Sequence, residues 1–245
     1  MTTEATLIAQ LADAQTKSLQ TVDALPYATL DRAAAYRVQT GVLAAVGATV
    51  GMLKTAVHPD GVGVVAPIFA ARVGQSGSFA LPAATLTGLE VEVGLVLARD
   101  LPQAVALADE VEIVEAISHY FVGVEVCGTR YRDRTISGPM GGLADSMSAF
   151  GYVIDPSPRD SGADIDNFDV AIDFAGQPLY SAPAKHGFGS VLASLVAYAK
   201  AQHPAYPLKA GTIITTGSLC GLVPFTGTGR VAARLGVHTV TFEII

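Results

Sequence analysis

From about residue 51 onward, apolar and polar side chains alternate with the two-residue period of a β-strand. In the segment 89–97, valines and leucines fall on one face of the expected strand, whereas Glu90 and Glu92 fall on the other. The same alternation marks three later segments: 168–174, 231–235 and 240–244. Frequent glycine and proline residues separate these segments, so the body of the chain is predicted to consist of short strands.

The start of the chain has a helical period instead. Thr3 can cap a first helix, and Thr29 or Asp31 can cap a second, because such side chains accept hydrogen bonds from the free N–H groups of the first turn. Apolar residues recur every three or four positions in both segments. Two later helices are predicted over 109–117 and 188–199.

These patterns predict an α+β fold, with an N-terminal helical cap over residues 1–50 and a β-rich body of mixed or antiparallel sheets over 51–245. No low-complexity linker or internal repeat separates the two parts, so one continuous domain is expected. A chain of 245 residues is long enough to bury a sizeable core.

Composition excludes several classes of function. The net charge of −7 and the lack of a basic cluster argue against a nucleic-acid surface. The most apolar stretch, 41–53, is too short to span a membrane, and residues 1–10 do not have the pattern of a signal peptide. Cys127 and Cys220 lie far apart, as expected of free thiols in a cytoplasmic protein. The mean hydropathy of +0.43 predicts a homo-oligomer.

Three acidic residues stand in otherwise apolar strands. Glu90 and Glu92 are two residues apart, which puts both carboxylates on one face, and Glu125 is the only acid in the apolar run 121–126. Neighbouring carboxylates repel each other and are costly to bury, and a cation between them removes both costs. Mg²⁺ prefers such oxygen ligands. A solvent-facing sheet edge accounts for Glu90 and Glu92 equally well.

Two further features could carry chemistry. Lys54 ends a Gly-rich apolar stretch and could move protons or bind an anion, although extension of the side chain to solvent is commoner for such a lysine. The hydroxyl-rich segment 215–218 could donate hydrogen bonds to a carboxylate, or could be an ordinary polar turn. No nucleophile elbow or phosphate-binding glycine loop occurs in the sequence, which argues against a serine hydrolase and against nucleotide binding.

The order and spacing of several segments match a known family. A Glu-x-Glu pair is followed some thirty residues later by a lone glutamate, and a Gly-Met-Leu-Lys-Thr segment precedes them. The matching segments are 34–39, 51–55, 66–69, 89–102, 122–126, 144–146 and 208–218. On these segments the chain resembles the fumarylacetoacetate hydrolase superfamily and, within it, the 2-keto-4-pentenoate hydratase branch.

The resemblance implies a β-rich roll and a metal-dependent lyase of aromatic-compound catabolism. Such an enzyme adds water to a 2-hydroxy-2,4-dienoate and yields a 4-hydroxy-2-oxo acid. The implied site holds Mg²⁺ or Mn²⁺ on Glu90, Glu92 and Glu125, transfers protons through Lys54 and Asp145, and binds the substrate with Thr216 and Ser218.

Three other functions remain open on the same scaffold. One is decarboxylation of a 2-oxo-3-enedioate, a second is hydrolysis of a C–C bond, and a third is a non-catalytic subunit in complex with a decarboxylase partner. The sequence departs from the hydratases over 70–76, and Ser146 stands where they usually carry asparagine. These departures bear on the substrate and the reaction more than on the metal.

Overall fold

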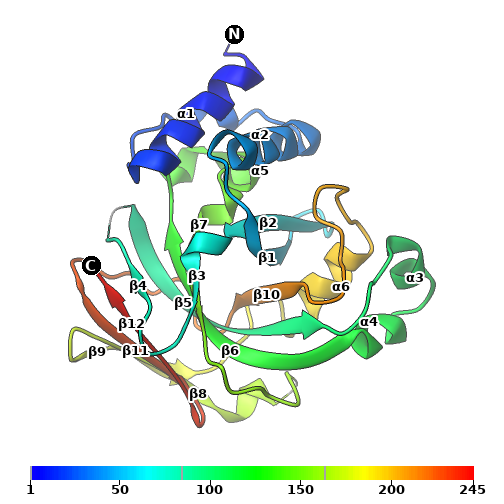
Figure 1. The fold of residues 1–245 in the computed structure, drawn as a ribbon, viewed down its shortest axis with the longest axis vertical. Helices are drawn as coiled ribbons and strands as arrows, with labels where there is room; N and C mark the ends of the chain where they lie inside the picture. Colours follow the sequence, from blue (N-terminus) through cyan, green and yellow to red (C-terminus); the bar gives the residue numbers. More distant parts are fainter. Residues whose placement is uncertain (1, 84, 163) are drawn as a thin grey trace.

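The computed structural model describes residues 2–83, 85–162 and 164–245. It shows an α+β fold in which helices near the N-terminus lie above a strongly curved sheet, with a second, smaller sheet beside it (Figure 1). The helices are α1 (Glu4–Lys17), α2 (Arg32–Ala45), α3 (Gln103–Ala108), α4 (Val111–Glu115), α5 (Gly138–Ala144) and α6 (Ala193–Ala199). The predicted fold class is confirmed.

The larger sheet has the strand order β2-β1-β10-β5-β6-β7-β3. It is antiparallel except where β1 pairs with β10 and β3 pairs with β7. It curls so far that β2, at one edge, contacts β7 near the other. Its strands are β1 (Val50–Val57), β2 (Gly63–Phe69), β3 (Val73–Gln75), β5 (Leu86–Leu97), β6 (Ile117–Gly128), β7 (Ala149–Ile154) and β10 (Ile213–Ser218).

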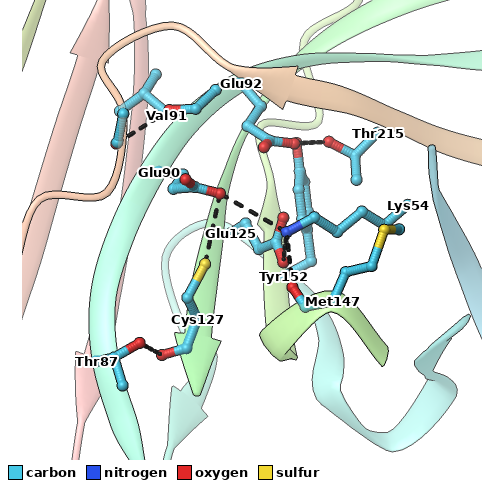
Figure 2. A network of polar contacts seen from close by, with 12 residues as sticks. Lys54, Thr87, Glu90, Val91, Glu92, Glu125, Cys127, Met147, Tyr152 and Thr215 are labelled. Atoms are coloured by element: carbon cyan, nitrogen blue, oxygen red, sulfur yellow. Dashed lines mark hydrogen bonds and ion pairs between the residues drawn. The ribbon is translucent and has the colours of Figure 1, made fainter. Parts of the chain in front are cut away.

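The smaller sheet has the order β4-β12-β11-β8-β9 and covers the outer face of β5 and β6. Val91 and Val93 of β5 and Val124 of β6 share a core cluster with Val231 and Phe242 of this sheet. The other face of β5 and β6, which carries the acids, points into the curl of the larger sheet (Figure 2). The strands are β4 (Ala80–Leu81), β8 (Asp169–Phe174), β9 (Gln177–Pro183), β11 (Gly229–Leu235) and β12 (His238–Ile244).

Both N-terminal helices begin where the sequence predicts. Thr3 accepts a hydrogen bond from the Thr6 N–H at 3.2 Å, and Asp31 accepts one from the Ala34 N–H at 2.7 Å. Residues of α1 and α2 share a second core cluster with Leu53 of β1 and with α5 and α6. No helix among the described residues is long and apolar enough to cross a membrane.

The later helices differ from the prediction. The predicted helix over 188–199 begins only at Ala193, because 187–192 forms a turn with a positive φ of 84° at Gly189. The helix predicted over 109–117 spans only Val111–Glu115, and in it Ile113 is buried whereas Val114 is 48% exposed. The Gly-rich helix α5 was not predicted, since glycine is a poor helix former.

Candidate functional site

Three carboxylates meet inside the curled sheet. Glu90 of β5 lies directly opposite Glu125 of β6 in the antiparallel register, and Glu92 follows two residues along β5 on the same face. Glu92 and Glu125 have no solvent exposure, whereas the side chain of Glu90 is 16% exposed (Figure 2). The acids are therefore interior groups reached from the Glu90 side, and the alternative of a solvent-facing edge is wrong.

Lys54 reaches the acids from β1. Its Nζ donates to Glu125 Oε1 at 2.8 Å and to the Met147 carbonyl at 3.3 Å, and it lies 3.7 Å from Glu90 Oε2. Only 11% of the lysine side chain is exposed. Burial lowers the pKa of Lys54, but the negative charges of Glu125 and its neighbours outweigh burial and hold the pKa well above its usual value. The lysine is therefore charged and does not extend to solvent.

Burial makes the ionised form of these acids unfavourable unless a positive charge lies nearby. It raises the pKa of Glu92 well above its usual value, and the charges of Glu125 and Glu90 raise it further. Burial also raises the pKa of Glu125, to about 7, although the adjacent Lys54 opposes this shift. A positively charged group bound among these acids would therefore stabilise the protein more than a neutral or negative group.

The pattern of free oxygen atoms fits a bound cation. Among the described residues, Glu92 Oε1 and Glu125 Oε2 are buried without any hydrogen-bond partner. Three carboxylates and one ammonium also leave two uncompensated negative charges, which a divalent ion would balance. Ligand atoms of Glu90, Glu125 and Cys127 lie within 4.8 Å of one another. The donor set therefore fits a divalent metal ion.

Thr215 and Tyr152 form the wall next to Glu92. The Thr215 hydroxyl donates to Glu92 Oε2 and lies 3.2 Å from the Tyr152 hydroxyl oxygen (Figure 2). Tyr152 pairs with Glu125 in the register of β6 and β7, and its ring lies over Gly123 of β6, where a Cβ would lie 2.1 Å from the ring. Sequence reasoning missed Tyr152 and included Thr215 only as part of the hydroxyl-rich segment 215–218, not as a site residue. Thr215 is one position from the predicted Thr216. Because successive side chains of a strand point to opposite faces, only one of the two can face the acids.

The structure places Thr216 and Ser218 away from the carboxylates. The Thr216 hydroxyl donates to the Val93 carbonyl at 2.7 Å and lies 3.4 Å from His186 Nε2. Ser218 lies opposite Glu92 in the strand register, but its hydroxyl donates to the Gly221 carbonyl at 3.0 Å. Neither hydroxyl contacts an acid of the cluster, and a substrate-binding role for both stays a prediction.

Asp145 is held in a buried ion pair. Its carboxylate accepts hydrogen bonds from the Arg130 side chain, from the Arg130 N–H at 3.1 Å and from the Thr129 hydroxyl at 2.7 Å. Burial raises the pKa of Asp145, and the Arg130 charge opposes that shift. The next residues, 146–148, all have positive φ angles, and this turn brings the Met147 carbonyl to Lys54. Asp145 thus anchors the turn, and its predicted part in proton transfer stays a prediction.

Comparison with known proteins agrees with this architecture. The family model described as fumarylacetoacetate (FAA) hydrolase C-terminal matches residues 53–244, which include Lys54 and all three acids. The chain belongs to this family. The superfamily inferred from the sequence is therefore confirmed, and the matched region extends from β1 to the last strand, β12.

Solved structures share the fold at low sequence identity. The 4-oxalocrotonate decarboxylase from Pseudomonas putida G7, complexed with magnesium and adipate, has a TM-score of 0.77 and 18% identity over 100% of this chain and 99% of that one. The fumarylpyruvate hydrolase from Pseudomonas aeruginosa, in complex with Mn²⁺ and pyruvate, has a TM-score of 0.52 and 15% identity over 79% of this chain and 88% of that one. The 2-hydroxyhepta-2,4-diene-1,7-dioate isomerase from Mycobacterium marinum has a TM-score of 0.54 and 17% identity over 79% of this chain and 75% of that one.

Proposed function

We propose that the protein is a metal-dependent hydratase that adds water to a 2-hydroxy-2,4-dienoate and yields a 4-hydroxy-2-oxo acid. The observation that carries this proposal is the buried cluster of Glu90, Glu92 and Glu125, in which two carboxylate oxygens have no partner among the described residues. Family membership supports it, since matched structures include enzymes that act on related oxo acids and dienols.

The three glutamates would hold Mg²⁺ or Mn²⁺. When bound, such an ion would act as a Lewis acid toward the carboxylate and C2 oxygen of the substrate. Glu92 is kept in place by the Thr215 hydroxyl, and Glu125 by the Lys54 ammonium, so the ligand oxygens are oriented by neighbouring side chains. A substrate would reach the cluster past Glu90, because Glu90 is the most exposed of the three acids.

Lys54 is the protein's own proton donor in this proposal. It is charged and lies 3.7 Å from Glu90, the most exposed of the three acids, and its Nζ can donate a hydrogen bond to an anionic substrate. Protonation of the dienol at its terminal carbon and loss of the proton from its C2 hydroxyl give a conjugated 2-oxo-3-enoate, to which water adds at C4. The Met147 carbonyl, 3.3 Å from Nζ, fixes the direction of the ammonium group.

Decarboxylation of a 2-oxo-3-enedioate is the second candidate. The observation that favours it is the match to the 4-oxalocrotonate decarboxylase, which covers 100% of this chain and 99% of that chain. Both reactions use the same metal-binding acids and differ in whether water is positioned for attack. The products distinguish them, because only decarboxylation releases carbon dioxide.

The test is an ultraviolet assay of dienols and 2-oxo acids with metal-free protein, before and after addition of Mg²⁺ or Mn²⁺. We expect activity only with the metal, and loss of the dienol absorbance without release of carbon dioxide. Glu92→Gln should weaken Mn²⁺ binding by at least about tenfold in calorimetric titration, because it removes one charged ligand. Full activity of the metal-free protein, or unchanged Mn²⁺ affinity of the variant, would reject the proposal.

A further inference from the structure

Cys127 brings a sulfur atom into the acid cluster. It lies two residues after Glu125 on the inward face of β6, and its thiol donates to Glu90 Oε2 at 3.5 Å (Figure 2). Its backbone carbonyl accepts a hydrogen bond from the Thr87 hydroxyl at 3.2 Å, which holds this part of the strand in place. The residue is buried, with 3% exposure, so the thiol is directed to the cluster and not to bulk solvent.

A second observation marks this place as a binding site. Glu125 is fully buried, and its Oε2 has no hydrogen-bond partner among the described residues, while Oε1 accepts from Lys54. One oxygen of Glu90, one oxygen of Glu125 and the Cys127 sulfur lie within 4.8 Å of one another, close enough to hold one ion. An unpartnered carboxylate oxygen beside a thiol is a ready pair of ligands.

We propose that Cys127 is a metal ligand for thiophilic divalent ions, Co²⁺, Zn²⁺ and Cd²⁺, which bind through the Cys127 sulfur together with Glu90 and Glu125. The inference rests on the proposed metal site and extends it to a second, overlapping set of ligands. Mg²⁺ and Mn²⁺ use the oxygen set of Glu90, Glu92 and Glu125. The hardness of the ion decides which set it takes, since thiolates prefer soft ions and carboxylates prefer hard ones.

The mixed set carries charges that the ion and Lys54 can offset. On binding, the thiol transfers its proton to solvent, and the sulfur keeps the electron pair that forms the bond to the metal. The two carboxylates and the thiolate of this set carry three negative charges, which match the two positive charges of the ion and the one of Lys54, and the neighbouring Glu92 adds a fourth negative charge to the cluster. Lys54 lies 2.8 Å from Glu125 and 3.7 Å from Glu90, close enough to supply this charge without itself binding the ion.

Co²⁺ is the probe, because a cobalt–thiolate bond gives charge-transfer absorption in the near ultraviolet and a carboxylate-only site does not. Metal-free wild-type protein should develop this absorption with Co²⁺. Cys127→Ser should lose the absorption and bind Cd²⁺ at least about tenfold more weakly, with Mn²⁺ affinity changed less than about threefold.

Cys220 is the matched control, because it is the other cysteine of the chain and its sulfur contacts Ser218 and the Val91 N–H, not Glu90 or Glu125. Cys220→Ser should keep the cobalt absorption. Absorption that disappears in Cys220→Ser, or Co²⁺ binding to the wild type without it, would overturn the role of Cys127 and leave the oxygen site intact. Failure of the wild type to bind either Co²⁺ or Mn²⁺ would overturn the proposed metal site as well. The wild type and Cys220→Ser decide the matter even if Cys127→Ser does not fold.

Discussion

Removal of the Lys54 charge tests the electrostatic account of the site without any substrate. Lys54→Met keeps most of the side-chain length but removes the ammonium that pairs with Glu125 and Glu90. Breaking a buried ion pair by removing one partner costs about 3–5 kcal/mol. For a chain of this length, 1 kcal/mol changes Tm by roughly 2–4 °C, so we expect a loss of about 6–20 °C. Uptake of a proton by one carboxylate would bring the loss toward the lower figure.

The assay is thermal unfolding, which gives Tm, and urea unfolding, which gives the free energy of unfolding, of the chelator-treated variant, with Lys17→Met as the control. Lys17 pairs with Asp13 on the surface of α1, where both side chains are about 60% exposed, and such pairs contribute about 0.5 kcal/mol. Mn²⁺ at about 100 times its dissociation constant should restore about 2.7 kcal/mol of stability to Lys54→Met. A metal-free Lys54→Met protein within about 1 kcal/mol of Lys17→Met would refute the idea that the lysine compensates the acids.

Three further predictions follow from other parts of the structure. Burial lowers the pKa of His186 from 6.5 to about 4, so its stabilising contribution is complete above pH 6.5 and is lost as the pH falls toward 4; urea unfolding of His186→Gln should show a weaker fall in stability over this range. Gly63→Ala should destabilise the fold by about 1–3 kcal/mol, because its Cβ would lie 2.2 Å from the backbone of α6, whereas Gly142→Ala, with open space, should not. We expect a homo-oligomer by light scattering, which a monomeric mass would contradict.

The acid-bearing face of β5 could be predicted from the sequence because it depends on local geometry alone. A two-residue period puts Glu90 and Glu92 on the face opposite to Val91 and Val93 wherever the strand lies. The same reasoning predicted strands over 231–235 and 240–244, which the structure pairs as the hairpin of β11 and β12 with its turn at Gly236. The pairing of Glu90 with Glu125 could not follow from period alone, because register between distant strands is set by tertiary packing.

The other side of the site shows where local reasoning fails. The segment 215–218 was expected to be a turn or a hydroxyl-rich loop, but it is the end of β10, and its register with β5 shifts between Thr215 and Ser218. Gly217, with a φ of 120°, lies within this shift. Thr215 lies before the shift, in register with Lys54 of β1 and Gly94 of β5, so it shares the acid-bearing face and contacts Glu92. Ser218 lies after the shift, and its hydroxyl donates to the Gly221 carbonyl, an outcome that no periodic pattern predicts.

The two faces of β5 and β6 make opposite contributions to the stability of the fold. On the outer face, Val91, Val93 and Val124 are fully buried against the smaller sheet, and each contributes about 1.5–3 kcal/mol of hydrophobic free energy. On the inner face, Glu92 and Glu125 lose their hydration, and each has an oxygen without a partner in the described part of the chain, which costs several kcal/mol per ion. The packing of the outer face can therefore hold an arrangement of charges that is unfavourable by itself. A cation bound on the inner face removes much of that cost, and so ion binding and folding stability must be linked in this protein.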